Sequence, residues 1–272
     1  MTADTGSLHD DGLLVIALGL VRLAVDRHHR GNTGDINTKS SVTDPVTEVD
    51  RDSEQLIVDW LRSNRADDAI IGEEGACDDG ISGLTWIVDP LDGTVNYTYG
   101  FPAYAVSLAV QRDGETVAAV IHDTALDDQY TATLGGGSFC NGSRLSCSDI
   151  DDPAVMLLAT GFGYEREQRR RQGAVLAKLI PDVRDIRRAG SAAIDLCHVA
   201  AGRVDAYYET GPNVWDVAAG MLIVDEAGGR SRYDHDAKRI LASGTPGFAA
   251  INALVTTCEN TNRADGDTHD GK

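Results

Sequence analysis

One short stretch constrains the fold of this chain more than any other: WIVDPLDGT, residues 86–94. Its first three residues are apolar and predict the last part of a buried strand. Asp89 and Asp92 follow where that strand must end, and Pro90 between them cannot donate a hydrogen bond to a neighbouring strand. Two carboxylates so close together repel one another unless a positive charge lies between them. The stretch therefore predicts a strand that ends at a pair of acids, with a divalent metal ion as the simplest reason for the pair.

The composition is that of a globular protein with an unusually acidic charge balance. Asp and Glu number 43 against 24 Lys and Arg, so the 272-residue chain has a formal net charge of -19. A chain this acidic repels nucleic acid backbones and anionic membranes, and we expect neither as a partner. Its five cysteines are odd in number and form no C-x-x-C pair, which argues against a disulfide framework or a zinc site and favours the cytoplasm.

The spacing of apolar residues predicts alternating helices and strands. Residues 13–25 are strongly apolar, but Arg22 interrupts them and the run is short for a membrane span, so we expect a helix there. Helices are predicted at 8–29, 49–61, 167–180, 191–202, 215–229 and from Thr245 to about 258. Strands are predicted at 104–123 (two strands joined by Asp113-Gly114) and 204–209, and residues 69–75 are a short apolar run that ends in two glutamates.

This order of elements predicts one α/β domain over residues 1–259, with two sheet-containing halves at about 1–142 and 143–259. No internal repeat and no long linker divides the chain. Residues 260–272 contain a single alanine as their only apolar residue, so we expect a disordered tail there.

Acidic residues recur where predicted elements begin or end, namely Glu73, Glu74, Asp89, Asp92 and Asp216. Each has a simple structural explanation, as a solvated loop charge, a turn residue or a first-turn acid favoured by the helix dipole. Taken together they favour a site for a hard cation, because oxygen ligands without a His or Cys cluster suit Mg²⁺ or Mn²⁺.

Gly93 and Thr94 would complete a site for phosphoryl transfer. If a short helix begins at Thr94, its free backbone N–H groups can bind a phosphate beside the cations held by Asp89 and Asp92. Two cations would polarise the phosphorus, lower the pKa of a bound water and stabilise the leaving oxygen. They also reverse the local charge, so that an acidic protein can act on an anion.

Two long motifs resemble signatures of the inositol monophosphatase family. WIVDPLDGTVNY matches the pattern D-P-[IL]-D-G-T-x-N-[FY], and WDVAAGMLIVDEAGG, residues 215–229, matches the second signature. The segments KSSVTDPVTEVD, IGEEG and RRAGSAAIDLCHVAAGRVDAYYE also resemble family segments in the right order, so the resemblance covers about residue 36 to about 245. It implies a layered α-β-α-β-α sandwich of the sugar phosphatase type.

The resemblance also implies the metal ligands. Glu73, Asp89 and the backbone carbonyl of Leu91 match the ligands of one Mg²⁺ ion. Asp89, Asp92 and Asp216 match those of a second ion, and a third, more loosely bound ion is expected near Glu73. Mn²⁺ is the alternative metal.

Further residues match catalytic and substrate-binding positions of the family. Asp50 and Thr94 match a pair that orients and deprotonates the attacking water, and Glu73 is also expected to be a catalytic residue. The positions implied for binding phosphate and polyol are Lys39, Gly93, Thr94, Gly190, Ser191, Ala192, Glu209 and Asp216.

The expected function is Mg²⁺-dependent hydrolysis of a small polyol phosphate monoester, foremost inositol 1-phosphate, by direct attack of water without a phospho-enzyme. Fructose-1,6-bisphosphate, histidinol phosphate and a nucleotide phosphate are alternative substrates. Glu209 argues against bisphosphates, because a carboxylate there would repel a second phosphate. An alternative of another class is a binding or regulatory protein that keeps the fold. The resemblance further implies a homodimer.

Overall fold

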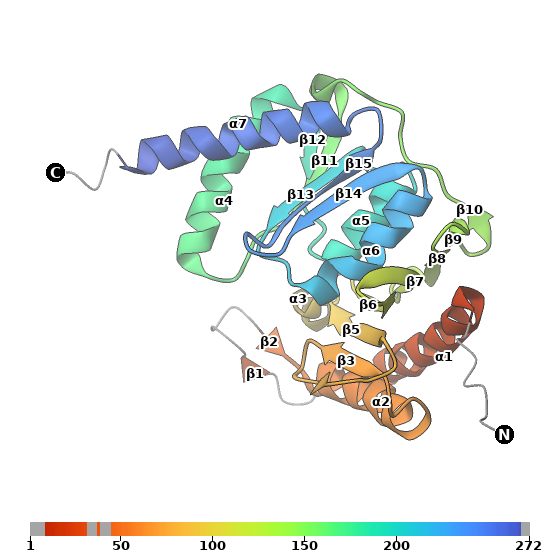
Figure 1. Cartoon of the computed structure of the whole chain (residues 1–272). Coiled ribbons are helices and arrows are strands. Elements are labelled where there is room, and N and C mark those ends of the chain that lie inside the picture. The colour runs from red at the N-terminus through yellow and green to blue at the C-terminus, as the bar shows by residue number, and fades with distance from the viewer. Residues whose placement is uncertain (1–8, 32–36, 39–44, 268–272) are drawn as a thin grey trace.

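The computed structural model describes residues 9–31, 37–38 and 45–267, without the side chains of 37–38, 45–46 and 262–267. These residues form five layers in the order α-β-α-β-α (Figure 1). The predicted fold class is therefore confirmed. Lys39, which we expected to contact the substrate, lies outside the described residues.

The first β layer is an eight-stranded sheet. Its strands, in spatial order, are β10 (Ser143–Arg144), β9 (Gly137–Cys140), β8 (Asp128–Thr133), β7 (Glu115–Asp123), β6 (Ala105–Arg112), β5 (Leu84–Asp92), β3 (Ala69–Gly72) and β4 (Cys77–Asp78). Within this sheet only β3 and β5 pair in parallel. Asp113 and Gly114, which connect β6 and β7, have φ angles of 50° and 86°. A type I′ turn requires positive φ at both positions, so the predicted hairpin is confirmed.

The second β layer is a five-stranded sheet. Its strands, in spatial order, are β12 (Asp185–Arg187), β11 (Leu157–Thr160), β13 (Ala206–Thr210), β15 (Arg239–Gly244) and β14 (Gly229–Asp234). β11 runs parallel to both of its neighbours, whereas β15 runs antiparallel to β13 and β14. Two short strands, β1 (Asn37–Thr38) and β2 (Pro45–Val46), pair separately.

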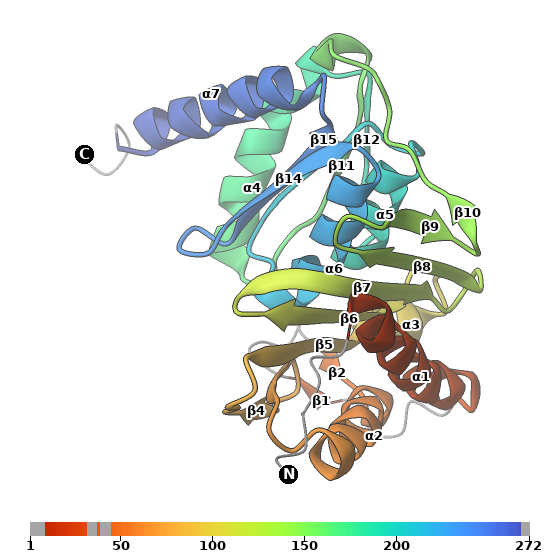
Figure 2. The same cartoon turned by 45° about the vertical axis from the view of Figure 1, so that its right-hand side comes forward.

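Helices form the other three layers (Figure 2). α1 (Asp10–His29) and α2 (Glu48–Asn64) cover the outer face of the first sheet, and α5 (Ala192–Ala200) and α6 (Val214–Glu226) lie between the two sheets. α4 (Arg166–Leu179) and α7 (Phe248–Asp267) cover the outer face of the second sheet. The remaining helices are α3 (Thr94–Tyr99), which follows β5, and two single 3₁₀ turns, Pro153–Val155 and Ile180–Asp182.

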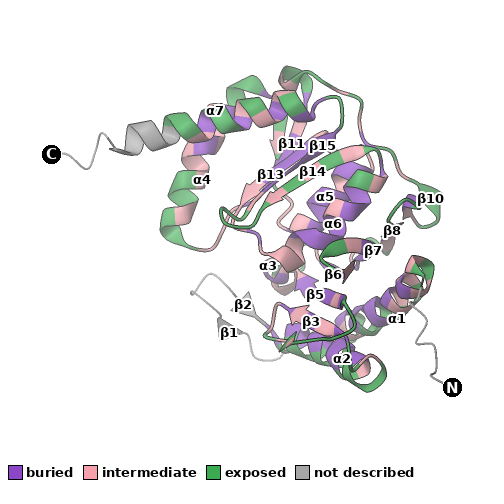
Figure 3. Ribbon diagram, viewed as in Figure 1, coloured by how far each residue is buried: buried purple, intermediate pink, exposed green. Residues whose placement is uncertain are grey.

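Burial along β5 explains how the fold positions the opening motif (Figure 3). Trp86 and Val88 pack with α1 and α2, and Ile87 packs in the cluster that contains α5 and α6. Side chains alternate along a strand, so Asp89 follows on the face of Ile87 and points toward α6. Ser107, which pairs with Asp89, faces the same way and donates a hydrogen bond to the carbonyl of Trp215 on α6 (3.4 Å).

The strand does not end at Asp89, so that expectation is wrong. β5 continues to Asp92, and the pairing with β6 shifts register between these two acids. Pro90 lies in the irregular part, where its missing N–H leaves no gap in the ladder. The irregularity allows both carboxylates to belong to one strand and still approach the same site.

Both ends of the last helix differ from expectation. α7 begins at Phe248 rather than beside Thr245, whose hydroxyl instead donates to the carbonyl of Gly228 (2.9 Å). Its backbone continues to Asp267, whereas we expected a disordered tail from residue 260. Ile251 and Val255 are buried and hold the first turns of α7 in place. Extending a helix that has already begun is easier than starting one, so polar residues can continue it. Residues 268–272 lie outside the described part of the chain.

Candidate active site

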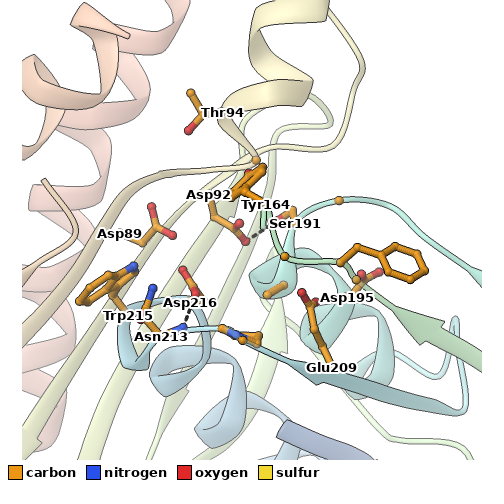
Figure 4. A pocket seen from close by; sticks show the side chains of 18 of the residues that line it. Asp89, Asp92, Thr94, Tyr164, Ser191, Asp195, Glu209, Asn213, Trp215 and Asp216 are labelled. Carbon is orange, nitrogen blue, oxygen red and sulfur yellow. Dashed lines mark hydrogen bonds between the residues drawn. The ribbon is translucent and has the colours of Figure 1, made fainter. Parts of the chain in front are cut away.

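A cavity of about 300 Å³ opens where β5, α3, α5, β13 and α6 meet (Figure 4). Eleven residues that the sequence predicted for the site border it: Glu73, Asp89, Leu91, Asp92, Gly93, Thr94, Gly190, Ser191, Ala192, Glu209 and Asp216. Asp50 does not line the cavity, but its side chain contacts Thr94 from behind. The structure therefore brings together acids that are as far apart in sequence as Glu73 and Asp216.

The loop after β3 carries Glu73 and is held by a buried acid on α2. The carboxylate of Glu54 accepts hydrogen bonds from the backbone N–H groups of Glu74 (2.8 Å) and Ala76 (3.1 Å). A side chain at Gly72 would collide with this carboxylate, at 2.3 Å from its Oε2 atom. Glu54 thus fixes the path of the loop at the position of Glu73, a role that we did not predict from the sequence.

Asp92 connects the first sheet to α5. Its Oδ2 atom accepts from the hydroxyl of Ser191 (2.6 Å) and from the N–H of Ala193 (2.7 Å), at the first turn of α5. Burial raises the pKa of Asp92 to about 6, although these hydrogen bonds act in the opposite direction. Asp216 is held in a similar way in the first turn of α6, where it accepts from the N–H of Asn213.

The acids around the cavity raise one another's pKa values. For Asp89 and Asp216, burial is the largest cause, and the negative charges of Glu73 and Asp92 add to it. Asp92 and Asp216 keep part of their surface on the cavity, although both lie deep in the protein. Such a group of carboxylates is costly to ionise together without a cation.

The chemistry of these donors fits a hard divalent cation, because all of them are oxygens. In the described ranges, however, no group of three or more His, Cys, Asp or Glu side chains is already arranged to hold a metal ion. The side chains would have to close around an ion when it binds.

Thr94 and Asp50 form the contact that the resemblance implied. The Thr94 hydroxyl lies 2.8 Å from Oδ1 of Asp50, with the carbonyl of Leu91 as a second acceptor at 3.1 Å. The other oxygen of Asp50 accepts from the N–H (2.8 Å) and the hydroxyl of Thr47, in a capping box that begins α2. The end of a helix therefore fixes the carboxylate that faces Thr94.

Glu209 lies across the cavity from Asp89, on β13. The hydroxyl of Tyr207, two residues earlier, donates to its Oε2 atom (2.6 Å). Burial raises the pKa of Glu209 to about 7, against the effect of this hydrogen bond. Nearby, Asn96 of α3 positions the loop of Gly190 by donating to the carbonyl of Ala189 (3.0 Å).

A buried histidine supports the acid pair from the side of α1, and the sequence did not predict it. The ring of His28 contacts the carbonyl of Pro90 (3.0 Å) and the hydroxyl of Thr124 (3.1 Å). A carbonyl only accepts, so Nε2 carries the proton and Nδ1 accepts from Thr124. Burial lowers the pKa of His28 to about 4. Its partners lie 62 and 96 residues away in the chain, so no local pattern could reveal them.

Several residues that line the cavity were also missed: Phe162, Tyr164, Gln168, Arg188 and Asp195. Arg188 and Asp195 belong to the segment RRAGSAAIDLC, in which only Gly190, Ser191 and Ala192 matched substrate positions. The acidity of Asp195 at the start of a helix was the signal that could have identified it.

The five layers and the acid-lined cavity define a protein of the sugar phosphatase fold. Residues 11–260 match the inositol monophosphatase family. An inositol-1-monophosphatase SuhB from Mycobacterium tuberculosis is 50% identical over 206 residues, which cover 72% of this chain and 71% of that protein. A Nus factor SuhB from Pasteurella multocida is 44% identical over 194 residues, 71% of this chain and 73% of that protein.

Solved structures agree with the sequence comparisons. The Thermotoga maritima IMPase superposes with a TM-score of 0.82 at 32% identity, over 93% of this chain and 98% of that one. The chain therefore belongs to the inositol monophosphatase family, and this membership supports a phosphatase activity. None of the described helices combines the length and the apolar composition needed to cross a membrane.

Proposed function

We propose that this protein hydrolyses a small polyol phosphate monoester with the help of Mg²⁺, and that inositol 1-phosphate is the foremost substrate. One observation carries the proposal: the acids Glu73, Asp89, Asp92 and Asp216 border the same cavity as Gly93, Thr94 and Glu209. The name of the Mycobacterium tuberculosis relative, an inositol-1-monophosphatase, supports the choice of substrate.

The metal ligands in this proposal are the four acids and the carbonyl of Leu91, with Glu73, Asp89 and Leu91 for one ion and Asp89, Asp92 and Asp216 for the second. A third ion near Glu73 is part of the proposal, and Mn²⁺ is the alternative metal. When bound, these ions neutralise the acids and the phosphate, lower the pKa of water and stabilise the leaving oxygen.

The residues of the chain position the water and the ester. The Thr94 hydroxyl donates to Asp50, so its lone pairs are left to accept a hydrogen bond from the attacking water. Asp50, behind it, can take up the hydroxyl proton of Thr94 while Thr94 takes up the proton that the water loses. The backbone N–H groups of Gly93 and Thr94 bind the phosphate in this proposal, and Glu209 accepts from hydroxyls of the polyol. Glu209 disfavours a second phosphate, which argues against bisphosphate substrates.

Phosphate release tests the proposal. The purified protein is incubated with Mg²⁺ and inositol 1-phosphate, fructose-1,6-bisphosphate, histidinol phosphate and 3′-phosphoadenosine 5′-phosphate, and we expect the fastest release from inositol 1-phosphate. Asp92→Asn should lower the rate by more than about 100-fold with the fold intact, because it removes a ligand charge. Asp78→Asn changes an acid that pairs with Arg62 away from the cavity and should leave the rate unchanged. An active Asp92→Asn protein would contradict the assigned ligand.

A second candidate function is regulatory, and the Pasteurella multocida relative named Nus factor SuhB favours it. The panel separates the two candidates, because a folded protein that releases phosphate from none of the esters would support the regulatory function. A homodimer and a cytoplasmic location stay predictions, and light scattering on the purified protein tests the first.

A further inference from the structure

Asp195 is a buried acid that the proposed reaction does not use. It lies in the first turn of α5, is 2% exposed, and borders the cavity. Among the described residues, no hydrogen bond or ion pair involves its carboxylate, although its backbone N–H donates to Ser191. Buried carboxylates are almost always hydrogen-bonded, so the cavity must supply the donor.

Negative charges around Asp195 further disfavour a carboxylate that has no hydrogen-bond donor. Burial raises the pKa of Asp195 most, and the negative charges of Glu209 and Asp92 raise it further. Seven of the residues that line the cavity are Asp or Glu, and Arg188 is the one Lys or Arg among the described ones. Arg188 is exposed and lowers the pKa of Asp195 only as the smallest of the contributions.

Asp195 lies on the side of the cavity where the leaving group would bind. Figure 4 shows its carboxylate beside Glu209 and away from Asp89. The same arrangement appears in the electrostatics, because Glu209 is the charge that affects Asp195 most, whereas Glu73 has that role for Asp89. Asp195 and Glu209 therefore lie at one end of the cavity, and Asp89 and Glu73 lie at the other.

We propose that Asp195 is a specificity-determining residue that, together with Glu209, accepts hydrogen bonds from hydroxyl groups of the leaving group. This inference rests on the proposed function. It narrows the substrate class to esters whose leaving group carries several hydroxyls, because each acid needs its own donor. Ring polyols satisfy this condition, and phenols do not.

The test compares two esters in the magnesium-loaded enzyme. Inositol 1-phosphate has a leaving group rich in hydroxyls, and 4-nitrophenyl phosphate has none. Asp195→Asn should lower kcat/KM for inositol 1-phosphate about tenfold or more, mainly through KM, because a hydrogen bond to the leaving group is weakened. The value for 4-nitrophenyl phosphate should stay within about twofold. Asp195→Ser is the second variant, and Glu165→Gln, an exposed acid at the rim of the same cavity, is the control that should change neither value.

Thermal stability distinguishes a substrate-binding role of Asp195 from a structural one, because the two roles predict opposite changes in Tm. If Asp195 serves the substrate, Asp195→Asn removes a buried acid without a donor and should keep or raise Tm. The rise in Tm that Mg²⁺ causes should equal that of the wild type. A lower Tm, or equal losses of kcat/KM with both esters, would show a structural role and overturn the inference, as would an unchanged kcat/KM for inositol 1-phosphate.

The two proposals can fail separately. A wild-type protein that releases phosphate from neither ester would refute the proposed function. Calorimetry with inositol 1-phosphate and Mg²⁺ would then decide on Asp195, because weaker binding by Asp195→Asn would support the inference and equal binding would overturn it. A wild-type protein that does not bind inositol 1-phosphate would refute both.

Discussion

Ser191 shows how one hydroxyl can serve both the fold and the site. It donates to Asp92 (2.6 Å) and accepts from the N–H of Ile194 (3.2 Å) as the N-cap of α5. Ser191→Ala should weaken Mg²⁺ binding by about 10–100-fold, as is usual when a ligand loses its hydrogen-bond partner. The lost cap should lower the free energy of unfolding by about 1 kcal/mol. The Mg²⁺ dependence of initial rates and denaturant unfolding measure the two effects.

Ser191→Thr is the matched control for that prediction. Threonine keeps the hydroxyl and is also an N-cap residue, so this variant should retain wild-type Mg²⁺ affinity. If Ser191→Ala bound Mg²⁺ as tightly as the wild type, the hydrogen bond to Asp92 would have no part in metal binding.

His28 should make the protein sensitive to acid. Its pKa is about 4 in the folded protein and 6.5 ordinarily, so between these values the unfolded chain binds the proton more readily. The stability from neutral His28 is complete above pH 6.5 and is lost as pH falls toward 4, by on the order of 3 kcal/mol. His28→Gln should reduce the difference in unfolding free energy between pH 6.5 and 4.5. His29→Gln, which changes the exposed neighbour and removes only a lesser contribution to the lowered pKa of His28, should change that difference much less. An equal acid sensitivity in His28→Gln would contradict the prediction.

The residues that sequence could predict are those that occur in motifs. Asp89, Asp92 and Thr94 lie within six residues of each other, and their types alone suggest a metal and a phosphate. Glu54 and His28 support the same site through contacts 20 to 62 residues distant in the chain, and neither has an unusual local context. Their roles follow from packing between layers, which periodicity does not encode.

At the scale of elements, α3 is the part on which the geometry of the proposed phosphate site depends. It is a six-residue helix with glycine at both caps: Gly93 has φ of 90° and Gly100 has φ of 68°. A Cβ atom at Gly93 would lie 2.8 Å from the carbonyl oxygen of Ala103, whereas one at Gly100 would meet no atom within 4 Å. Substitutions at these two glycines therefore distinguish backbone strain, which both positions share, from steric collision, which only Gly93 would cause.

Gly100→Ala should lower the free energy of unfolding by about 1 kcal/mol, the usual effect of a side chain at positive φ. Gly93→Ala adds the collision and should lower it by more than about 2 kcal/mol, with a loss of phosphate release that Gly100→Ala does not show. Denaturant unfolding and initial rates measure both. Equal effects of the two substitutions would show that the approach of Ala103 does not constrain α3.

Element types were easier to predict than element ends. The helix predicted over residues 8–29 and the hairpin predicted over 104–123 follow from periodicity and from one Asp-Gly turn. The structure confirms the hairpin and a helix at Asp10–His29. The continuation of β5 past Pro90 depends on pairing with β6, and the late start of α7 depends on the contact of Thr245 with Gly228. Ends of this kind are determined by tertiary neighbours, so local signals could not locate them.

At the scale of the whole molecule, the fold concentrates negative charge in the cavity between its layers. The pKa of Asp92 rises from an ordinary 3.8 to about 6, and that of Glu209 from 4.5 to about 7, in both cases chiefly because of burial. A carboxyl with a raised pKa stabilises the folded state below its ordinary pKa and loses this contribution as pH rises through the raised value. Without metal, we therefore expect the contribution of Asp92 and Glu209 to the free energy of unfolding to decrease as pH rises from about 4 to about 7.

Magnesium should reverse this trend, because it binds the ionised carboxylates and competes with protons for them. At 100 times its Kd a ligand of the folded state adds about 2.7 kcal/mol to the free energy of unfolding. We expect the rise in Tm caused by Mg²⁺ to be larger at pH 8 than at pH 5.5, as measured by calorimetry against samples with chelator. Asp92→Asn should remove most of this rise at both pH values, whereas Asp78→Asn should not. A rise that does not depend on pH would mean that Mg²⁺ binds away from these acids, and the metal ligands assigned to the cavity would then be wrong.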